Sequence, residues 1–131
     1  MLLAVNGTLM RGLALNGNML ESGAVFVRET ATAPVYRLWS IGDRHPGMVR
    51  VKEGGAAIAV EVWQVEPDGL VQILEREPPG LGIGRLELED GSQVWGVLAE
   101  AYLVEHQVEI TSYGGWHAYM ARRPQGDPGS Q

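Results

Sequence analysis

Cysteine is absent from this chain of 131 residues. Its absence excludes disulfide bonds, thiol nucleophiles and zinc sites built on cysteine, and it is typical of cytosolic proteins. The sequence also lacks an apolar run near the roughly 20 residues that a membrane-spanning helix needs. The N-terminus does not have the basic and long apolar segments of a secretory signal. We therefore predict a soluble, cytoplasmic protein.

Clustered positive charge is missing as well. The 10 lysines and arginines are scattered along a chain that carries 16 acidic residues and a net charge of −6. Because a phosphate backbone is held by basic clusters, this pattern argues against a nucleic-acid partner. His45, His106 and His117 match no metal-ligand spacing, and no serine lies in the context of a nucleophile elbow. We predict no metal, no cofactor and no membrane contact.

The chain does contain enough apolar sequence for one core. Hydrophobic residues make up 45% of it, and alternating or β-branched segments dominate. The predicted strands cover 1–5, 24–27 leading through Thr30 and Thr32 to 35–39, 48–51, 57–65, 86–89 and 94–98. The predicted short helices cover 15–20, 68–76 and 111–120. The segment 57–65 is apolar on both parities, so both of its faces should be covered, and Asp90-Gly91 predicts a hairpin.

The first strand ends abruptly at Asn6-Gly7. These residue types permit a sharp turn of the backbone. A strand that ends in a tight turn directs several backbone N–H groups one way, and such a nest can hold a carboxylate or another small anion. A glycine turn after a strand is common, however, so on spacing alone an ordinary turn remains the alternative.

The segment from Asn6 to Gly12, Asn-Gly-Thr-Leu-Met-Arg-Gly, resembles the Tyr-Gly-Ser/Thr-Leu signature of the γ-glutamylcyclotransferase-like superfamily, with Asn6 replacing the tyrosine. One branch of it, the C-terminal domain of allophanate hydrolase, resembles nearly the whole chain from residue 3 to residue 121. The segments that match in family order are 12–16, 23–27, 32–38, 47–51, 54–58, 61–63, 81–84, 96–100, 110–116 and 118–119.

The resemblance implies an α+β fold for a domain over residues 1–121. The expected architecture is a small mixed, mostly antiparallel β-barrel, with a few short helices outside and a cavity at one end. Residues 122–131 are predicted to form a disordered tail, because 124–131 are rich in Pro, Gly, Ser and Gln. No amidase domain accompanies the small one, so we expect it to stand alone.

Superfamily members that cyclise γ-glutamyl groups use a cavity glutamate as acid and base. A carboxyl in an apolar pocket has the raised pKa that proton transfer near neutral pH requires. Glu100 ranks first here, because it ends an apolar strand and matches the branch's Gly-x-Leu-x-Glu pattern. Glu61, inside the longest apolar strand, ranks second. Glu77 ranks third, since it lies one residue out of register with the superfamily's glutamate. An outward-facing Glu61 and a solvated Glu77 remain the alternatives.

The predicted ligand contacts combine the turn, an arginine, a glycine pair and two aromatic residues: Asn6, Gly7, Thr8, Leu9, Arg37, Gly82, Ile83, Gly84, Tyr113 and Trp116. Arg37 could offer its guanidinium to a carboxylate. Gly82 and Gly84 let the backbone approach a ligand, and Tyr113 and Trp116 supply aromatic walls. The alternatives are an outward-facing arginine and core packing of Trp116.

One position departs from the allophanate hydrolase branch. The histidine that its C-terminal domain needs corresponds to Leu9, which can neither transfer a proton nor donate a hydrogen bond from its side chain. One hypothesis is an enzyme, cyclotransferase-like or hydrolase-like, that acts on a small carboxylate or amide metabolite through a glutamate. The alternative is a non-catalytic accessory or metabolite-binding module for a separate amidase. A homo-oligomer with Trp39 and Trp95 at its contact is a third possibility.

Overall fold

The structure is a computed structural model that describes residues 1–123. Its strands form a five-stranded sheet with the order β2-β5-β1-β7-β6 and a three-stranded sheet with the order β4-β3-β8. Strands β1 and β7 run parallel, whereas the other paired strands run antiparallel. The strands are β1 (Leu2–Val5), β2 (Val25–Ala31), β3 (Tyr36–Ile41), β4 (His45–Arg50), β5 (Ala59–Gln64), β6 (Leu81–Glu87), β7 (Gln93–Ala99) and β8 (Val108–Glu109).

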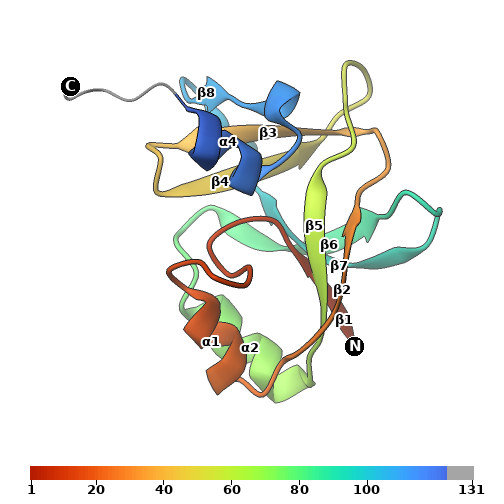
Figure 1. The fold of residues 1–131 in the computed structure, drawn as a ribbon, viewed down its shortest axis with the longest axis vertical. Helices are drawn as coiled ribbons and strands as arrows, with labels where there is room; N and C mark the ends of the chain where they lie inside the picture. The colour runs from red at the N-terminus through yellow and green to blue at the C-terminus, as the bar shows by residue number, and fades with distance from the viewer. Residues whose placement is uncertain (124–131) are drawn as a thin grey trace.

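Short helices complete the fold. They are α1 (Asn16–Glu21), α2 (Pro67–Glu75), α3 (Ala101–Val104), the 3₁₀ turn η1 (Thr111–Tyr113) and α4 (Trp116–Arg122). Figure 1 shows α1 and α2 side by side at one end of the molecule and α4 beside the three-stranded sheet at the other. Within residues 1–123, no helix is long and apolar enough to cross a membrane.

The predicted α+β architecture is confirmed, whereas the predicted closed barrel is not. In the part of the chain that the structure describes, β2 and β6 remain the outer strands of the larger sheet. A single bridge between Thr32 and Leu88 brings the far ends of these two strands together. The larger sheet is therefore strongly curved at that end but is not closed by a ladder of strand pairs.

Strand β1 is the centre of the larger sheet. Leu3, Ala4 and Val5 are completely buried, because β5 and β7 pair with the strand on its two sides. The neighbouring β5 is buried from Val60 to Trp63, so both of its faces are covered, as its sequence predicts. An apolar run of this kind suits a strand that lies between covered faces. The turn after β1 is consequently anchored in the core.

Several boundaries differ from the sequence predictions. The strand predicted from residue 86 begins at Leu81, and the helix predicted over 111–120 is divided into η1 and α4 by Gly114, whose φ is +83°. Strand β8 and helix α3 were not predicted. Arg122 ends α4 and Arg123 pairs with Asp43 at 2.9 Å, so these two residues of the predicted tail are ordered; residues 124–131 lie outside the described part.

Gly7 lies where the turn after β1 meets strand β4. A Cβ atom on Gly7 would come within 2.4 Å of Pro46 Cδ. Because the proline ring is rigid, the two backbones would have to move apart. The glycine is therefore required by packing at the point where the turn crosses β4.

We expect Gly7→Ala to lower the free energy of unfolding by about 1–3 kcal/mol, the usual cost of overpacking. Gly17→Ala in α1 is the matched control, because a Cβ there meets nothing within 4 Å. It should leave stability unchanged or raise it by about 0.5–1 kcal/mol. Urea unfolding measures both variants, and equal stability of the two would contradict the Gly7 contact with Pro46.

Candidate functional site

At the start of the loop after β1, the carbonyl groups of Gly7, Thr8 and Leu9 accept hydrogen bonds, whereas their N–H groups have no acceptor among residues 1–123. Three hydrogen bonds occupy those carbonyls: Met10 N to Gly7 O at 2.9 Å, Leu15 N to Thr8 O at 3.0 Å, and Asn16 Nδ2 to Leu9 O at 2.9 Å. No acceptor among residues 1–123 takes a hydrogen bond from the N–H of Gly7, Thr8 or Leu9. Because buried N–H groups normally have partners, this run of donors is suited to an anion.

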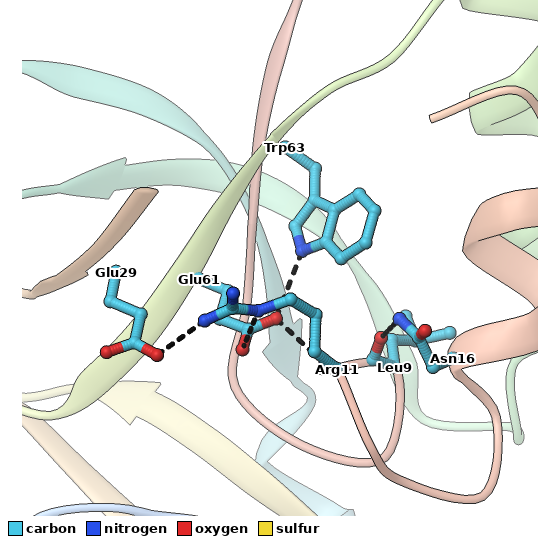
Figure 2. A network of polar contacts seen from close by, with 6 residues as sticks. All are labelled: Leu9, Arg11, Asn16, Glu29, Glu61 and Trp63. Carbon is cyan, nitrogen blue, oxygen red and sulfur yellow. Dashed lines mark hydrogen bonds and ion pairs between the residues drawn. The ribbon is translucent and has the colours of Figure 1, made fainter. Parts of the chain in front are cut away.

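A buried carboxylate holds the far end of this loop. Glu61 Oε1 accepts hydrogen bonds from Arg11 N at 2.9 Å and from Trp63 Nε1 at 3.2 Å. Its other oxygen pairs with Arg11 Nε at 3.2 Å. Figure 2 shows the guanidinium of Arg11 lying between Glu61 and Glu29, with Trp63 on the other side of Glu61. Glu61 is 4% exposed, so these contacts offset the cost of burying its charge.

The side-chain amide of Asn6 makes a contact within the protein. Its Nδ2 donates to the carbonyl of Val97 at 3.0 Å, and the residue is buried. The side chain therefore ties the start of the turn to β7. The sequence prediction placed Asn6 among the ligand contacts; its amide is already used within the protein.

Two adjoining hollows open beside the turn, with volumes of about 20 and 390 Å³. Both are lined by Thr8, His45, Glu77 and Leu81. The smaller one is also lined by Asn6, Gly7, Leu9, Pro46 and Val97, and the larger one by Leu15, Ile41, Arg44, Pro78, Pro79 and Leu103. We call the region of Gly7, Thr8, Leu9, His45 and Glu77 the turn site.

Glu77 brings a carboxyl with a raised pKa to the turn site. Burial raises the pKa of its carboxyl from an ordinary value of 4.5 to about 7. No donor among residues 1–123 forms a hydrogen bond or ion pair with this carboxyl. Glu77 comes two residues after the end of α2. Its side chain lines the same hollow as Thr8, where a proton-transfer group could reach a ligand held by the turn.

The hairpin between β3 and β4 brings two basic residue types to the turn site. Arg44 and His45 line its larger hollow. The preceding Asp43 accepts hydrogen bonds from Ser40 Oγ at 2.5 Å and Tyr119 OH at 2.6 Å. These hydrogen bonds lower the pKa of Asp43 below its ordinary value, and the bond from Ser40 has the largest effect. Asp43 thereby ties the hairpin to α4 and fixes the backbone that carries Arg44 and His45.

A second and larger cavity, of about 630 Å³, lies between α4 and β5. We call it the α4 cavity. It is lined by Met10, Arg11, Glu29, Thr30, Ala59, Val60, Glu61, Tyr113, Gly114, Gly115, Trp116, His117 and Ala118. None of these residues lines the hollows of the turn site, so the α4 cavity and the turn site are separate from each other.

The structure separates the predicted site residues into three groups. Those at the turn site are Asn6, Gly7, Thr8, Leu9 and Glu77. Those at the α4 cavity are Glu61, Tyr113 and Trp116. Those that line neither are Glu100, Arg37, Gly82, Ile83 and Gly84. Within residues 1–123, no group of three or more His, Asp and Glu side chains is placed to hold a metal ion.

Local packing explains the third group. Glu100 is exposed at the start of α3, where its N–H donates to Gly80 O at 2.8 Å. Arg37 turns outward, and its Nε donates to Gly54 O at 3.1 Å. Gly84 lies opposite Gly96 in the β6–β7 ladder, and a Cβ on Gly84 would come within 2.9 Å of the Leu98 side chain. Gly84 therefore makes room for the Leu98 side chain, whereas a Cβ on Gly82 would meet nothing within 4 Å.

His45, Arg44 and Pro46 were not among the predicted site residues. They reach the turn site because the β3–β4 hairpin folds over the turn after β1. The sequence carries no local pattern for this contact, since nearly forty residues separate the two segments. Arg11 was likewise missed as a partner of Glu61, although its position directly after the turn brings it there.

Comparison with known proteins finds a family that matches residues 1–121. The model of the allophanate hydrolase C-terminal domain family matches residues 1–121. A urea amidolyase from Saccharomyces cerevisiae is 32% identical over 125 residues, which cover 90% of this chain and 7% of that protein. The chain thus spans a small fraction of the length of this curated relative.

Solved structures of other proteins are also similar to this chain. The uropathogenic E. coli-specific protein c4763 is 56% identical, with a TM-score of 0.90 and coverage of 94% of this chain and 97% of the other. An AIG2-like protein from Mus musculus is 22% identical, with a TM-score of 0.60 and coverage of 78% and 77%. At that identity the likeness concerns the fold alone, and it confirms the predicted resemblance in fold to the wider superfamily.

Glu77 should make the stability of the protein depend on pH. Near pH 6 the folded protein keeps the Glu77 proton that the unfolded chain has lost, so stability falls as pH rises from about 4.5 to about 7. Glu77→Gln stays neutral throughout. We expect it to match the wild type at pH 4 and to exceed its free energy of unfolding by up to about 3 kcal/mol at pH 8.

Urea unfolding at pH 4, 6 and 8 measures this difference. The control is Glu100→Gln, which removes an exposed carboxyl and should keep the pH dependence of the wild type. A Glu77→Gln variant with the same pH dependence as the wild type would show that the Glu77 pKa is not raised.

Proposed function

Since the chain belongs to the family of allophanate hydrolase C-terminal domains, we propose that it is a cytosolic γ-glutamylcyclotransferase-like enzyme whose turn site binds a small amide that carries a carboxylate. In this proposal the backbone N–H groups of Gly7, Thr8 and Leu9 hold the carboxylate. Glu77 transfers protons at the amide. The observation that carries the proposal is the partly buried Glu77 carboxyl, which has no hydrogen-bond donor among residues 1–123 and shares a hollow with Thr8.

The turn supplies binding without a charged side chain. Its three N–H groups have no acceptor among residues 1–123, and an oxyanion bound to them would replace the missing partners. Arg44 on the rim of the larger hollow adds a cation that can attract an anionic substrate. This combination favours a small metabolite with a carboxylate over an extended polymer.

Glu77 can act as both base and acid. A substrate amine attacks the carbonyl carbon of the substrate's own amide, and the Glu77 carboxylate accepts the proton that this amine loses. The amide C–N bond then breaks, and the Glu77 acid gives the proton to the departing nitrogen. The products are a cyclic amide and a free amine, and no water is consumed. A carboxyl with a pKa of about 7 is present in both forms at neutral pH.

The second candidate function is binding without catalysis. Leu9 is 3% exposed. The resemblance implies that it replaces the histidine that the related domain needs, and this replacement favours binding over the chemistry of that domain. The relative in yeast, a urea amidolyase, contains the similar sequence as 7% of its length. A separate domain of this kind would bind a small carboxylate, or would associate with a separate amidase.

Turnover of γ-glutamyl-alanine to 5-oxoproline and alanine tests the first function. If Glu77 is the acid and base, Glu77→Gln should lower kcat/KM by about 10²-fold or more. Glu100→Gln is the control and should keep the wild-type kcat/KM, because its carboxyl lines neither candidate site. Mass spectrometry measures the 5-oxoproline that the wild type and the two variants form.

Turnover, measured together with ligand binding and association with an amidase, separates the two functions. Thermal stabilisation by glutarate without turnover, or association with an amidase, would favour the binding module. Equal turnover by the wild type and Glu77→Gln would remove Glu77 from the reaction. If Glu77→Gln turns over the substrate like the wild type and Glu100→Gln does not, Glu100 is the catalytic glutamate, as the sequence pattern ranks it.

A further inference from the structure

We propose that the α4 cavity is a second binding site, separate from the turn site, and that it takes a small organic cation: an ammonium or guanidinium group on an apolar body. Its volume of about 630 Å³ exceeds that of either hollow at the turn site. Pockets of roughly 300–1,000 Å³ are the usual size of small-molecule sites. The proposal does not depend on the function of the turn site.

The apolar wall of this cavity is already in place. Tyr113 packs edge-on against Tyr119 with ring centroids 5.0 Å apart, and Trp116 lies 5.8 Å from the same ring. Gly114 O accepts a hydrogen bond from Ala59 N at 2.8 Å, which ties the loop before α4 to β5. The aromatic wall therefore does not have to form when a ligand arrives, and this reduces the entropic cost of binding.

The charged side of the cavity is also held in a fixed geometry. The Arg11 guanidinium pairs with Glu61 and Glu29 and lies 3.6 Å from the centroid of the Phe26 ring. Figure 2 shows this guanidinium between the two carboxylates. Since its contacts to Glu61 and Glu29 are already made, Arg11 has little attraction left for an anionic ligand.

The charge balance then selects the class of ligand. Glu29 and Glu61 contribute two negative charges against one positive charge of Arg11, which leaves the cavity at −1 when His117 is neutral. The side chain of Glu29 is 71% exposed. Its Oε1 has no donor among residues 1–123, because the contact with Arg11 uses Oε2. A cation beside Glu29 would restore neutrality, and the aromatic ring of Tyr113, which lines the same cavity, would also attract it.

Three probes of similar shape and different charge test the proposal on the full chain: benzamidine, benzamide and benzoate. We expect benzamidine to bind with a Kd in the millimolar range, as suits a fragment of its size, benzamide to bind more weakly and benzoate not to bind. Chemical shifts in two-dimensional NMR locate the site. The amides of Gly114, Gly115 and Ala118 should move, and those of Thr8 and Leu81 should not.

Variants with matched controls test the two halves of the site. Glu29→Lys should abolish benzamidine binding and allow benzoate to bind. Glu53→Lys makes the same change in net charge on an exposed residue away from the cavity, and it should bind benzamidine like the wild type. Ala118→Trp should fill the cavity and remove binding of every probe, whereas Ala121→Trp, on an exposed position of α4 outside the lining, should not.

Binding of benzoate as tight as that of benzamidine would overturn the charge argument. Shifts centred on Thr8 and Leu81, or no binding of benzamidine up to about 10 mM, would overturn the site itself. Because Ala118→Trp alters a partly buried position, its circular dichroism must match that of Ala121→Trp. The exposed Glu29→Lys change keeps the proposal testable if Ala118→Trp does not fold.

Discussion

The buried carboxylate of Glu61 is the constraint on which both candidate sites depend. A charge in the middle of β5 is costly unless it is paired and hydrogen-bonded. Arg11 supplies a backbone N–H and a guanidinium, and Trp63 supplies an indole N–H. Because one of these donors is a backbone group, satisfying Glu61 also fixes the path of the chain where it leaves the loop after β1. The same contacts place Arg11 on the rim of the α4 cavity.

A binding surface made of backbone tolerates changes of side chain. The carbonyls of residues 7 to 9 accept hydrogen bonds from the loop and from Asn16, and their N–H groups have no acceptor among residues 1–123. This pattern does not depend on a tyrosine at position 6, where Asn6 makes a different contact to Val97. It does not depend on a histidine at position 9 either, where Leu9 packs in the core. The turn can therefore keep its geometry while its side-chain chemistry differs from that of related domains.

The sequence predicts the parts of the fold that depend on local patterns. The run from Ala57 to Val65 predicts a strand covered on both faces, and β5 has this burial. Asp90-Gly91 predicts a hairpin, and Gly91 has a φ of +85° there. Helix α3 has four residues, too few for a periodic signal. The path of the strands that prevents a closed barrel depends on pairing between distant segments, which periodicity does not encode.

The candidate site is less predictable than the strands, because it depends on which distant groups meet. The turn itself is visible as Asn6-Gly7, and it lines the smaller hollow. The ranking of the glutamates rested on neighbours in sequence, which favoured Glu100 at the end of an apolar strand. Glu100 is exposed at the start of α3, whereas Glu77 is partly buried and lines a hollow together with the turn and the first residues of β4.

Glu61 and Glu77 show that burial alone does not decide what a carboxyl can do. Glu61 is surrounded by donors on both oxygens, so its role is to hold Arg11 and the loop. Glu77 has no hydrogen-bond donor among residues 1–123. Desolvation therefore raises the pKa of its carboxyl, and no hydrogen bond or ion pair there lowers it again. Two carboxyls in one small domain can thus serve structure and proton transfer, because their partners differ. A desolvated acid with no donor in the described part of the chain is the stronger candidate for chemistry, since no structural contact there uses its charge.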